Sequence, residues 1–191
     1  RGPHAVEDLI SVLDRIDSAR RIPPARVWLS ENERAWAKTR LAALPAGRHL
    51  AMGPGANWEP KIWPLDHFRS LLDKVADRFE GVLILGGPGD RERATLLARD
   101  LPLPALNLTG ETTLLQAAAL LEHCSLFVGN DSGLGHMAAA VETPTITVFG
   151  PGQPERYHPW SPCAHWLRGP EDRLELLAPD TVAATLLEHL G

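Results

Sequence analysis

The sequence has little cysteine and no long apolar run. Only two cysteines occur among its 191 residues, Cys124 and Cys163, and their spacing fits neither a disulfide framework nor a zinc site. A reducing compartment is therefore expected. No apolar stretch approaches the ~18 residues of a membrane-spanning helix, and no signal-peptide pattern is visible at the N-terminus.

A surplus of basic residues is also missing. The chain has 19 Lys and Arg against 24 Asp and Glu, which gives a formal net charge of −5 and a pI of about 5.9. This balance excludes a broad basic face for nucleic acid. An apolar share of 44% and a charged share of 23% are typical of a soluble globular protein. The length suits one domain, or one domain with a fragment of another.

Several catalytic motifs are absent. The eight histidines show no ligand spacing such as H-E-x-x-H, so no metal site is predicted. There is no G-x-x-x-x-G-K-[ST] phosphate loop. The segment Gly129–Gly133 is not a G-x-S-x-G nucleophile elbow, because its serine stands one place late. Only Asp131 and His136 stand out as candidate general bases.

What the sequence does contain is an alternation of apolar runs and amphipathic segments. Near-continuous apolar runs predict buried parallel strands, and apolar residues at i, i+3 and i+4 predict covering helices. Strands are predicted at 49–52, 82–85, 105–108, 126–128, 145–149 and 166–167, and helices at 1–18, 30–44, 64–79, 91–99, 112–123, 133–140 and 181–190. The fold class is therefore α/β, a Rossmann-like, doubly wound parallel sheet with helices on both faces.

The expected strand order determines where a ligand binds. In the order 3-2-1-4-5-6, the first and fourth strands are neighbours at the switch point, and ligands bind beyond the carboxyl ends of the strands there. The loop 53–61 and the turn 130–136 should therefore face one crevice. Because the first helix has no strand before it and a polar, proline-bearing link after it, we expect a segment 1–24 and a main domain 25–191.

The turn after the fourth strand has the composition of a phosphate site. Asn130, Asp131 and Ser132 are all good N-cap residues. Gly133 and Gly135 follow in the first turn of a helix, where glycine costs stability. A well-capped helix start would explain the polar residues, but the glycines favour a ligand. Free N–H groups and the positive end of the helix would bind a phosphate.

Two other segments carry complementary groups. Lys61 ends a loop rich in glycine and proline, and its ammonium gives a second positive element for a diphosphate. Asp90 follows the second strand, where ribose hydroxyls are usually held, and Glu92 competes for this role. A G-x-G-x-x-A pattern starts at Gly133, but it follows the fourth strand and no acidic residue ends the next one. NAD is therefore not predicted.

Together these motifs resemble the carboxyl-terminal domain of glycosyltransferase family 9, the heptosyltransferases of bacterial lipopolysaccharide core synthesis. The resemblance covers residues of about 25–191 and rests on Gly53-Pro54-Gly55-Ala56, Lys61, Trp63-Pro64, Gly129-Asn130-Asp131-Ser132-Gly133, His136, Ala138-Ala139-Ala140, Thr143-Pro144 and Val148-Phe149-Gly150-Pro151. It implies the C-terminal half of a GT-B enzyme, in which two Rossmann-like domains face a cleft and this one holds the nucleotide-sugar donor.

The resemblance also implies which residues bind the donor. Lys61 would hold the donor phosphate, Asp90 the ribose, and Thr112 would lie near the adenine edge. Asn57 stands where the family often has a hydroxyl residue near the phosphates. The implied donor-binding residues are Lys61, Asn57, Asp90, Thr112, Asp131, Ser132, Gly133, Leu134 and His136. No catalytic residue is assigned, because the base is expected in a missing N-terminal domain. No metal and no cofactor are expected.

The implied reaction transfers a sugar from a donor such as ADP-heptose to a lipid A–core saccharide. It would take place at the cytoplasmic face of the bacterial inner membrane, with which the full enzyme would associate peripherally. Residues 1–18 look like the interdomain helix that follows the missing acceptor domain. Two alternatives stay open: a stand-alone nucleotide-binding or regulatory module without transfer activity, and another GT-B relative such as a nucleotide-sugar epimerase.

Two departures from the family pattern concern the sugar pocket. Gly152 and Gln153 stand where the family usually has a Thr-Asp pair, and Gly135 stands where a larger residue is common. Both leave the identity of the donor sugar open.

Overall fold

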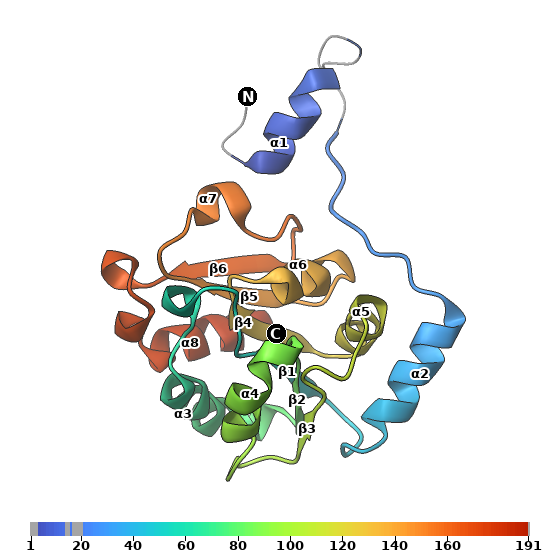
Figure 1. Cartoon of the computed structure of the whole chain (residues 1–191), viewed down its shortest axis with the longest axis vertical. Helices are drawn as coiled ribbons and strands as arrows, with labels where there is room; N and C mark the ends of the chain where they lie inside the picture. Colours follow the sequence, from blue (N-terminus) through green and yellow to red (C-terminus); the bar gives the residue numbers. More distant parts are fainter. Residues whose placement is uncertain (1–3, 14–15, 17–20, 191) are drawn as a thin grey trace.

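A six-stranded, all-parallel sheet forms the centre of the molecule (Figure 1). The computed structural model describes residues 4–13, 16 and 21–190. The strands are β1 (His49–Gly53), β2 (Gly81–Ile84), β3 (Ala105–Asn107), β4 (Leu126–Asn130), β5 (Thr145–Phe149) and β6 (Ala164–Arg168). Their order, β3-β2-β1-β4-β5-β6, confirms the predicted one and places β1 beside β4.

Helices cover both faces of this sheet, as predicted for a doubly wound fold. The α-helices are α1 (Ala5–Ile10), α2 (Glu31–Leu41), α3 (Leu65–Val75), α4 (Arg91–Leu97), α5 (Leu114–Glu122), α6 (Gly133–Ala140), α7 (Pro154–Tyr157) and α8 (Pro179–Leu190). Short 3-10 turns are η1 (Ser11–Leu13), η2 (Glu59–Lys61), η3 (Ala76–Arg78), η4 (Pro88–Asp90), η5 (Pro170–Asp172) and η6 (Leu174–Leu176). None of the helices in the described ranges is long and apolar enough to cross a membrane.

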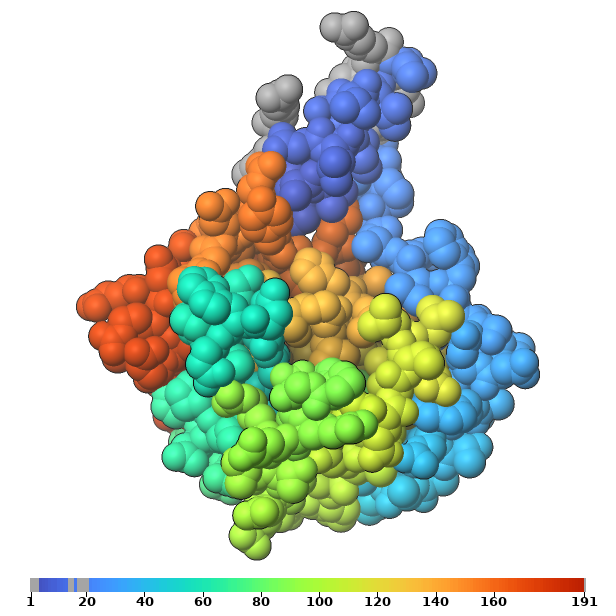
Figure 2. All heavy atoms as spheres, viewed as in Figure 1, coloured from blue at the N-terminus to red at the C-terminus, as the bar shows by residue number. Residues whose placement is uncertain are grey.

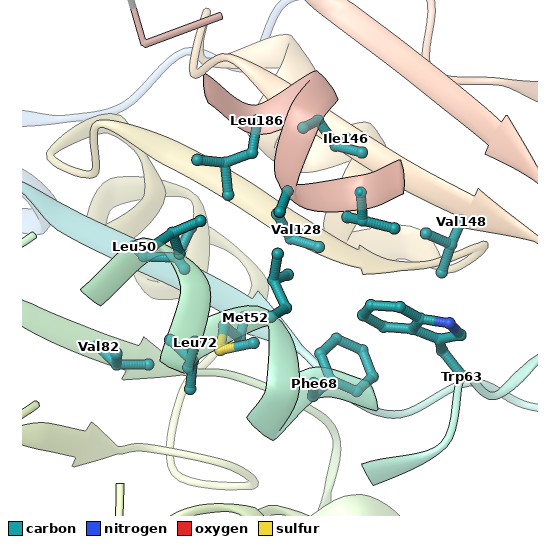
Figure 3. Close-up of a cluster of buried hydrophobic side chains, with 14 of the residues drawn as sticks. Leu50, Met52, Trp63, Phe68, Leu72, Val82, Val128, Ile146, Val148 and Leu186 are labelled. Carbon is teal, nitrogen blue, oxygen red and sulfur yellow. The ribbon is translucent and has the colours of Figure 1, made fainter. Parts of the chain in front are cut away.

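Strand side chains alternate between two hydrophobic cores. Leu50 and Met52 of β1 point to one face and pack with α3, α4 and α8 (Figure 3). Ala51, between them, belongs to the core shared with α2, α5 and α6. This alternation follows from the two-residue period of a strand. Because both faces are covered, the strands are apolar on both sides, which explains their near-continuous apolar runs.

The N-terminal helix is shorter than predicted. The periodicity predicts a helix over 1–18, whereas α1 ends at Ile10 and continues as the 3-10 turn η1. Residues 1–3, 14, 15, 17 and 18 of this prediction lie outside the described ranges. No residue of α1 is buried, and Leu9 is 72% exposed. The apolar spacing therefore predicts a helix correctly but does not show that its apolar face is covered.

Helix α7 and the lengths of several elements differ from the prediction. A single turn such as α7 is too short to show helical periodicity. The predicted helix 30–44 ends at Leu41, since the chain turns before Pro45, and the sixth strand is longer than the two residues predicted. None of these differences changes the topology.

Candidate functional site

Two adjoining hollows lie at the carboxyl ends of the central strands, one on each side of the first turn of α6. The first, of about 520 Å³, contains three of the predicted donor-binding residues, Lys61, Asp131 and His136. The second, of about 470 Å³, contains the other six, Asn57, Asp90, Thr112, Ser132, Gly133 and Leu134. The fold therefore brings all nine together around one turn of helix, although they come from distant loops.

The first turn of α6 leaves its backbone groups open. Ser132 is the N-cap residue, with extended φ and ψ angles of −150° and 170°, but its side chain makes no capping bond. Its buried hydroxyl oxygen has no hydrogen-bond partner within the part of the chain that the structure describes. A Cβ at Gly133 would meet nothing within 4 Å. Uncapped N–H groups and the positive helix end suit a bound phosphate.

Lys61 reaches this turn from the loop after β1. It ends the 3-10 turn η2, in which its own N–H donates to the Trp58 carbonyl at 2.9 Å. Its Nζ lies 2.6 Å from Asp131 Oδ2, and the two side chains are only 25% and 12% exposed. A cation is thus held beside the positive end of α6, with the Asp131 carboxylate as its counter-ion.

Asn130 connects the same two segments. Of the three predicted N-cap candidates, only Ser132 takes that position; Asn130 is instead the last residue of β4 and is completely buried. Its Oδ1 accepts a hydrogen bond from the Trp63 N–H at 2.9 Å, and its Nδ2 donates to the Gly55 carbonyl at 3.4 Å. One side chain therefore binds both ends of the loop that carries Lys61.

Asp90 lies at the second hollow, where the ribose was predicted to bind. Its Oδ2 accepts from the Gly87 N–H at 2.8 Å. A Cβ at position 55 would clash with the Asp90 carboxylate, so this close approach depends on Gly55. The competing Glu92 is exposed in the first turn of α4 and does not line either hollow.

The first hollow is closed on one side by α1 and α7. His4, at the N-cap of α1, accepts from the Val6 N–H through Nδ1 at 3.1 Å, so its Nε2 carries the proton that reaches the His158 carbonyl at 2.9 Å. Arg156 of α7 lies 2.7 Å from Asp8 of α1. Figure 2 shows α1, in dark blue, standing against this orange part of the surface.

The surroundings of His136 lower the pKa of its imidazole. Desolvation lowers its pKa below the ordinary value for histidine, and the nearby His4 and His158 lower it further. The carboxylate of Asp131 acts in the opposite direction and raises the pKa. A neutral imidazole can donate one hydrogen bond and accept another, which suits sugar hydroxyls.

The sequence did not reveal every residue around the two hollows. His4, Gln153, Arg156, Tyr157 and Trp160 line the first hollow and were not predicted as site residues. The departures from the family pattern at 152 and 153 point to the sugar pocket. The contribution of α1 to the first hollow, however, depends on how a separate helix packs. In the described residues, no group of three or more His, Cys, Asp or Glu side chains could hold a metal ion.

Comparison with known proteins agrees with the family resemblance of the sequence motifs. The family model described as glycosyltransferase family 9 (heptosyltransferase) matches residues 1–178. Lipopolysaccharide heptosyltransferase 3 of Escherichia coli K12 is 32% identical over 166 residues, which cover 84% of this chain and 48% of that protein. The chain thus spans about half the length of the curated relatives it matches.

Solved structures agree in fold. The ADP-heptose LPS heptosyltransferase II of E. coli superposes with a TM-score of 0.77 at 30% identity, over 86% of this chain and 53% of that one. The E. coli heptosyltransferase WaaC, solved with ADP-2-deoxy-2-fluoro heptose, gives a TM-score of 0.70 at 26% identity, over 97% of this chain and 56% of that one. These neighbours identify the domain as α/β and Rossmann-like, of the kind found in GT-B heptosyltransferases.

Proposed function

This chain belongs to glycosyltransferase family 9, and we propose that it is the donor-binding half of a heptosyltransferase-like enzyme. The observation that carries the proposal is the pair of hollows on either side of the α6 N-terminus, with Lys61 beside it. A nucleoside diphosphate sugar has the matching three-part form: a nucleoside, a doubly charged linker and a sugar.

Each part of the donor has a complementary part of the site. The second hollow, with Asp90 and Thr112, takes the nucleoside. The diphosphate crosses the first turn of α6, where Ser132, Gly133 and the Lys61 ammonium bind its oxygens. The first hollow takes the sugar, and His136 and Asp131 offer it hydrogen-bonding groups.

This arrangement supports an inverting displacement. The acceptor hydroxyl attacks the anomeric carbon, the bond from that carbon to the diphosphate oxygen breaks, and the diphosphate leaves with the bonding electrons. Lys61 and the positive end of α6 stabilise the negative charge that develops on the leaving group. The acceptor proton passes to a base that we place in the other half of the enzyme.

The donor we propose is ADP-linked, with ADP-heptose as the expected example. Support comes from two structural neighbours, the E. coli ADP-heptose LPS heptosyltransferase II and the heptosyltransferase WaaC solved with ADP-2-deoxy-2-fluoro heptose. The proposed acceptor is a lipid A–core saccharide, which a preceding domain would bind. We further propose that residues 1–24 join that domain to residues 25–191, and that the enzyme works without a metal at the cytoplasmic face of the inner membrane.

The test is calorimetric titration of this chain with ADP, UDP, GDP and NAD in parallel. We expect binding of ADP and clearly weaker binding of the other three. Equal binding of UDP or GDP would contradict the ADP assignment but keep a nucleotide-sugar donor. Absence of binding by all four would contradict the proposed donor site in this chain.

A further inference from the structure

The loop that carries Lys61 is fixed at two points by one buried side chain. Asn130 is 0% exposed and bonds to the backbone of Gly55, near the start of this loop, and of Trp63, at its end. Between these points lie Asn57 and Lys61, which line the second and the first hollow respectively. Asn130 therefore fixes the span of the loop that reaches both hollows.

The chemistry of the two bonds requires an amide at this position. The Trp63 N–H can only donate and the Gly55 carbonyl can only accept, so the residue at 130 must supply one acceptor and one donor. Asparagine has both on a short side chain. A carboxylate lacks the donor, and an apolar residue would leave two buried backbone groups unpaired, which is costly.

The position of Asn130 in the sheet explains its reach. It follows Gly129, which pairs with Gly53 where β4 and β1 run side by side. The next residue, Asp131, pairs with Lys61. Consecutive residues of β4 and the following turn thus hold the loop backbone and the loop ammonium.

From these contacts we propose that Asn130 is a positioning residue that acts on the donor diphosphate through Lys61. The inference rests on the proposed donor site. Without the two bonds, the loop 55–63 has more conformations to lose on binding, and the ion pair with Asp131 alone is left to position Lys61. Asn130 touches neither the diphosphate nor the sugar in this assignment.

A double-mutant cycle tests the proposal. We expect Asn130→Ala to weaken ADP binding about tenfold, measured by calorimetry on the full 191-residue chain. In the Lys61→Ala background, the same change should cost about twofold or less, because the group through which Asn130 acts is already missing. An equal loss in both backgrounds would overturn the proposal.

The control is Thr143→Val. Thr143 is also buried, and its hydroxyl donates to the Leu121 carbonyl at 2.7 Å. It precedes β5 and therefore lies at the amino ends of the strands, whereas the two hollows lie at their carboxyl ends. This variant should lower thermal stability while leaving ADP affinity unchanged. A loss of ADP affinity equal to that of Asn130→Ala would assign the effect to general destabilisation and overturn the proposal.

A measurement on the unmodified chain does not depend on whether the variants fold. Amide hydrogen exchange should show the Trp63 N–H protected like the N–H groups of the strands, and the Asn57 N–H exchanging faster. Equally fast exchange of these two N–H groups would overturn the proposal. If Asn130→Ala does not fold, Asn130→Asp, which keeps only the acceptor, replaces it in the cycle. If the unmodified chain does not bind ADP, the proposed function fails, whereas the exchange result still decides whether the loop is fixed.

Discussion

Lys61 brings a positive charge directly to the start of α6. Its side chain is 25% exposed, and its ammonium lies 2.6 Å from Asp131 beside an uncapped helix start. A charge-assisted hydrogen bond at such a place is worth about 1.5–3 kcal/mol. Most of this free energy becomes available to a ligand only if the diphosphate replaces or joins Asp131 as the partner of Lys61.

Replacing this lysine should therefore weaken ADP binding. We expect Lys61→Ala to raise the calorimetric Kd for ADP by about ten- to a hundredfold. Lys38→Ala is the matched control, because Lys38 is an exposed residue of α2 and does not line either hollow. Equal affinities of the Lys61 variant and the unmodified chain would remove Lys61 from the proposed site.

Individual residues differ in how far the sequence revealed them. Lys61 and Asp131 belong to recognisable motifs, and the fold places them at one turn. Asn130 is part of the same motif, but a polar residue after an apolar run is also a good N-cap, and only the folded loop shows what it binds. His4 has no local signal at all, because its partner His158 is 154 residues away.

The two positions of α6 that hold glycine do so for different physical reasons. A Cβ at Gly135 would lie 2.9 Å from Thr147 Oγ1 on β5, whereas a Cβ at Gly133 would meet open space beside the second hollow. Close packing of helix on sheet explains the first glycine. The proposed approach of a ligand to the helix start would account for the second.

This difference predicts opposite effects of the same substitution. Gly135→Ala should lower the free energy of unfolding by about 1–3 kcal/mol through overpacking. Gly133→Ala should leave stability unchanged or raise it by up to ~1 kcal/mol, while its methyl group weakens ADP binding. Urea denaturation and calorimetry on both variants separate the two effects. A Gly133 variant with full ADP affinity would contradict the placement of the diphosphate.

Strand β6 and helix α8 meet through a pair of histidines whose charge should matter at low pH. The rings of His165 and His189 are 3.6 Å apart, and burial, followed by the neighbouring His189, lowers the pKa of His165. The unfolded chain therefore binds a proton at a higher pH than the folded one. Neutral His165 therefore favours the folded state fully above about pH 6.5, the pKa of histidine in the unfolded chain. This stabilisation is lost as the pH falls through the lower pKa that His165 has in the folded protein.

We expect the free energy of unfolding to fall between pH 7.5 and 5.5, and to fall less in His165→Gln. Urea denaturation at both pH values measures this. His123→Gln, at an exposed position, should keep the full pH dependence. Part of the fall should remain in the His165 variant, since the pKa of His136 is lowered as well. An identical fall in both variants would contradict the role of His165.

The order of the elements could be predicted well, and their ends less well. Near-continuous apolar strands and glycine-rich turns indicated a parallel sheet, and right-handed crossovers leave few orders, of which 3-2-1-4-5-6 is the observed one. Helix α7 and the extent of α1 could not be predicted. The first is a single turn, and the second depends on contacts with Arg156 and His158.

The molecule as a whole consists of a sheet domain and an N-terminal segment packed on it. Trp160 Nε1 donates to the Pro23 carbonyl at 3.0 Å, and His4 Nε2 donates to the His158 carbonyl at 2.9 Å. Figure 1 shows the chain from residue 21 to α2 descending along one side of the domain. The segment thus supplies one wall of the first hollow without adding to the sheet.

Removal of residues 1–24 should therefore affect the two parts of a donor differently. We expect the shortened chain to bind ADP within about threefold of the full one, since the second hollow is intact. Any gain in affinity from ADP to an ADP-linked sugar should disappear, because His4, Ala5 and Val6 no longer line the first hollow. Calorimetry with both ligands measures the difference.

A point substitution provides the control for this truncation. His4→Ala in the full chain should reduce the same sugar-dependent gain while leaving ADP binding unchanged, because it removes the ring that packs on His158 and Trp160. If the shortened chain still distinguishes the ADP-linked sugar from ADP, the first hollow is not the sugar site.

The pairing of Lys61 with Asp131 joins residues 70 positions apart in the chain. In the unfolded polymer Lys61 and the start of α6 do not meet, so a nucleotide that needs both has affinity for the folded form alone. Each bound molecule then shifts the folding equilibrium, by about 2.7 kcal/mol at a free concentration a hundred times the Kd. The supply of the proposed donor would in this way govern how long the polypeptide survives proteolysis.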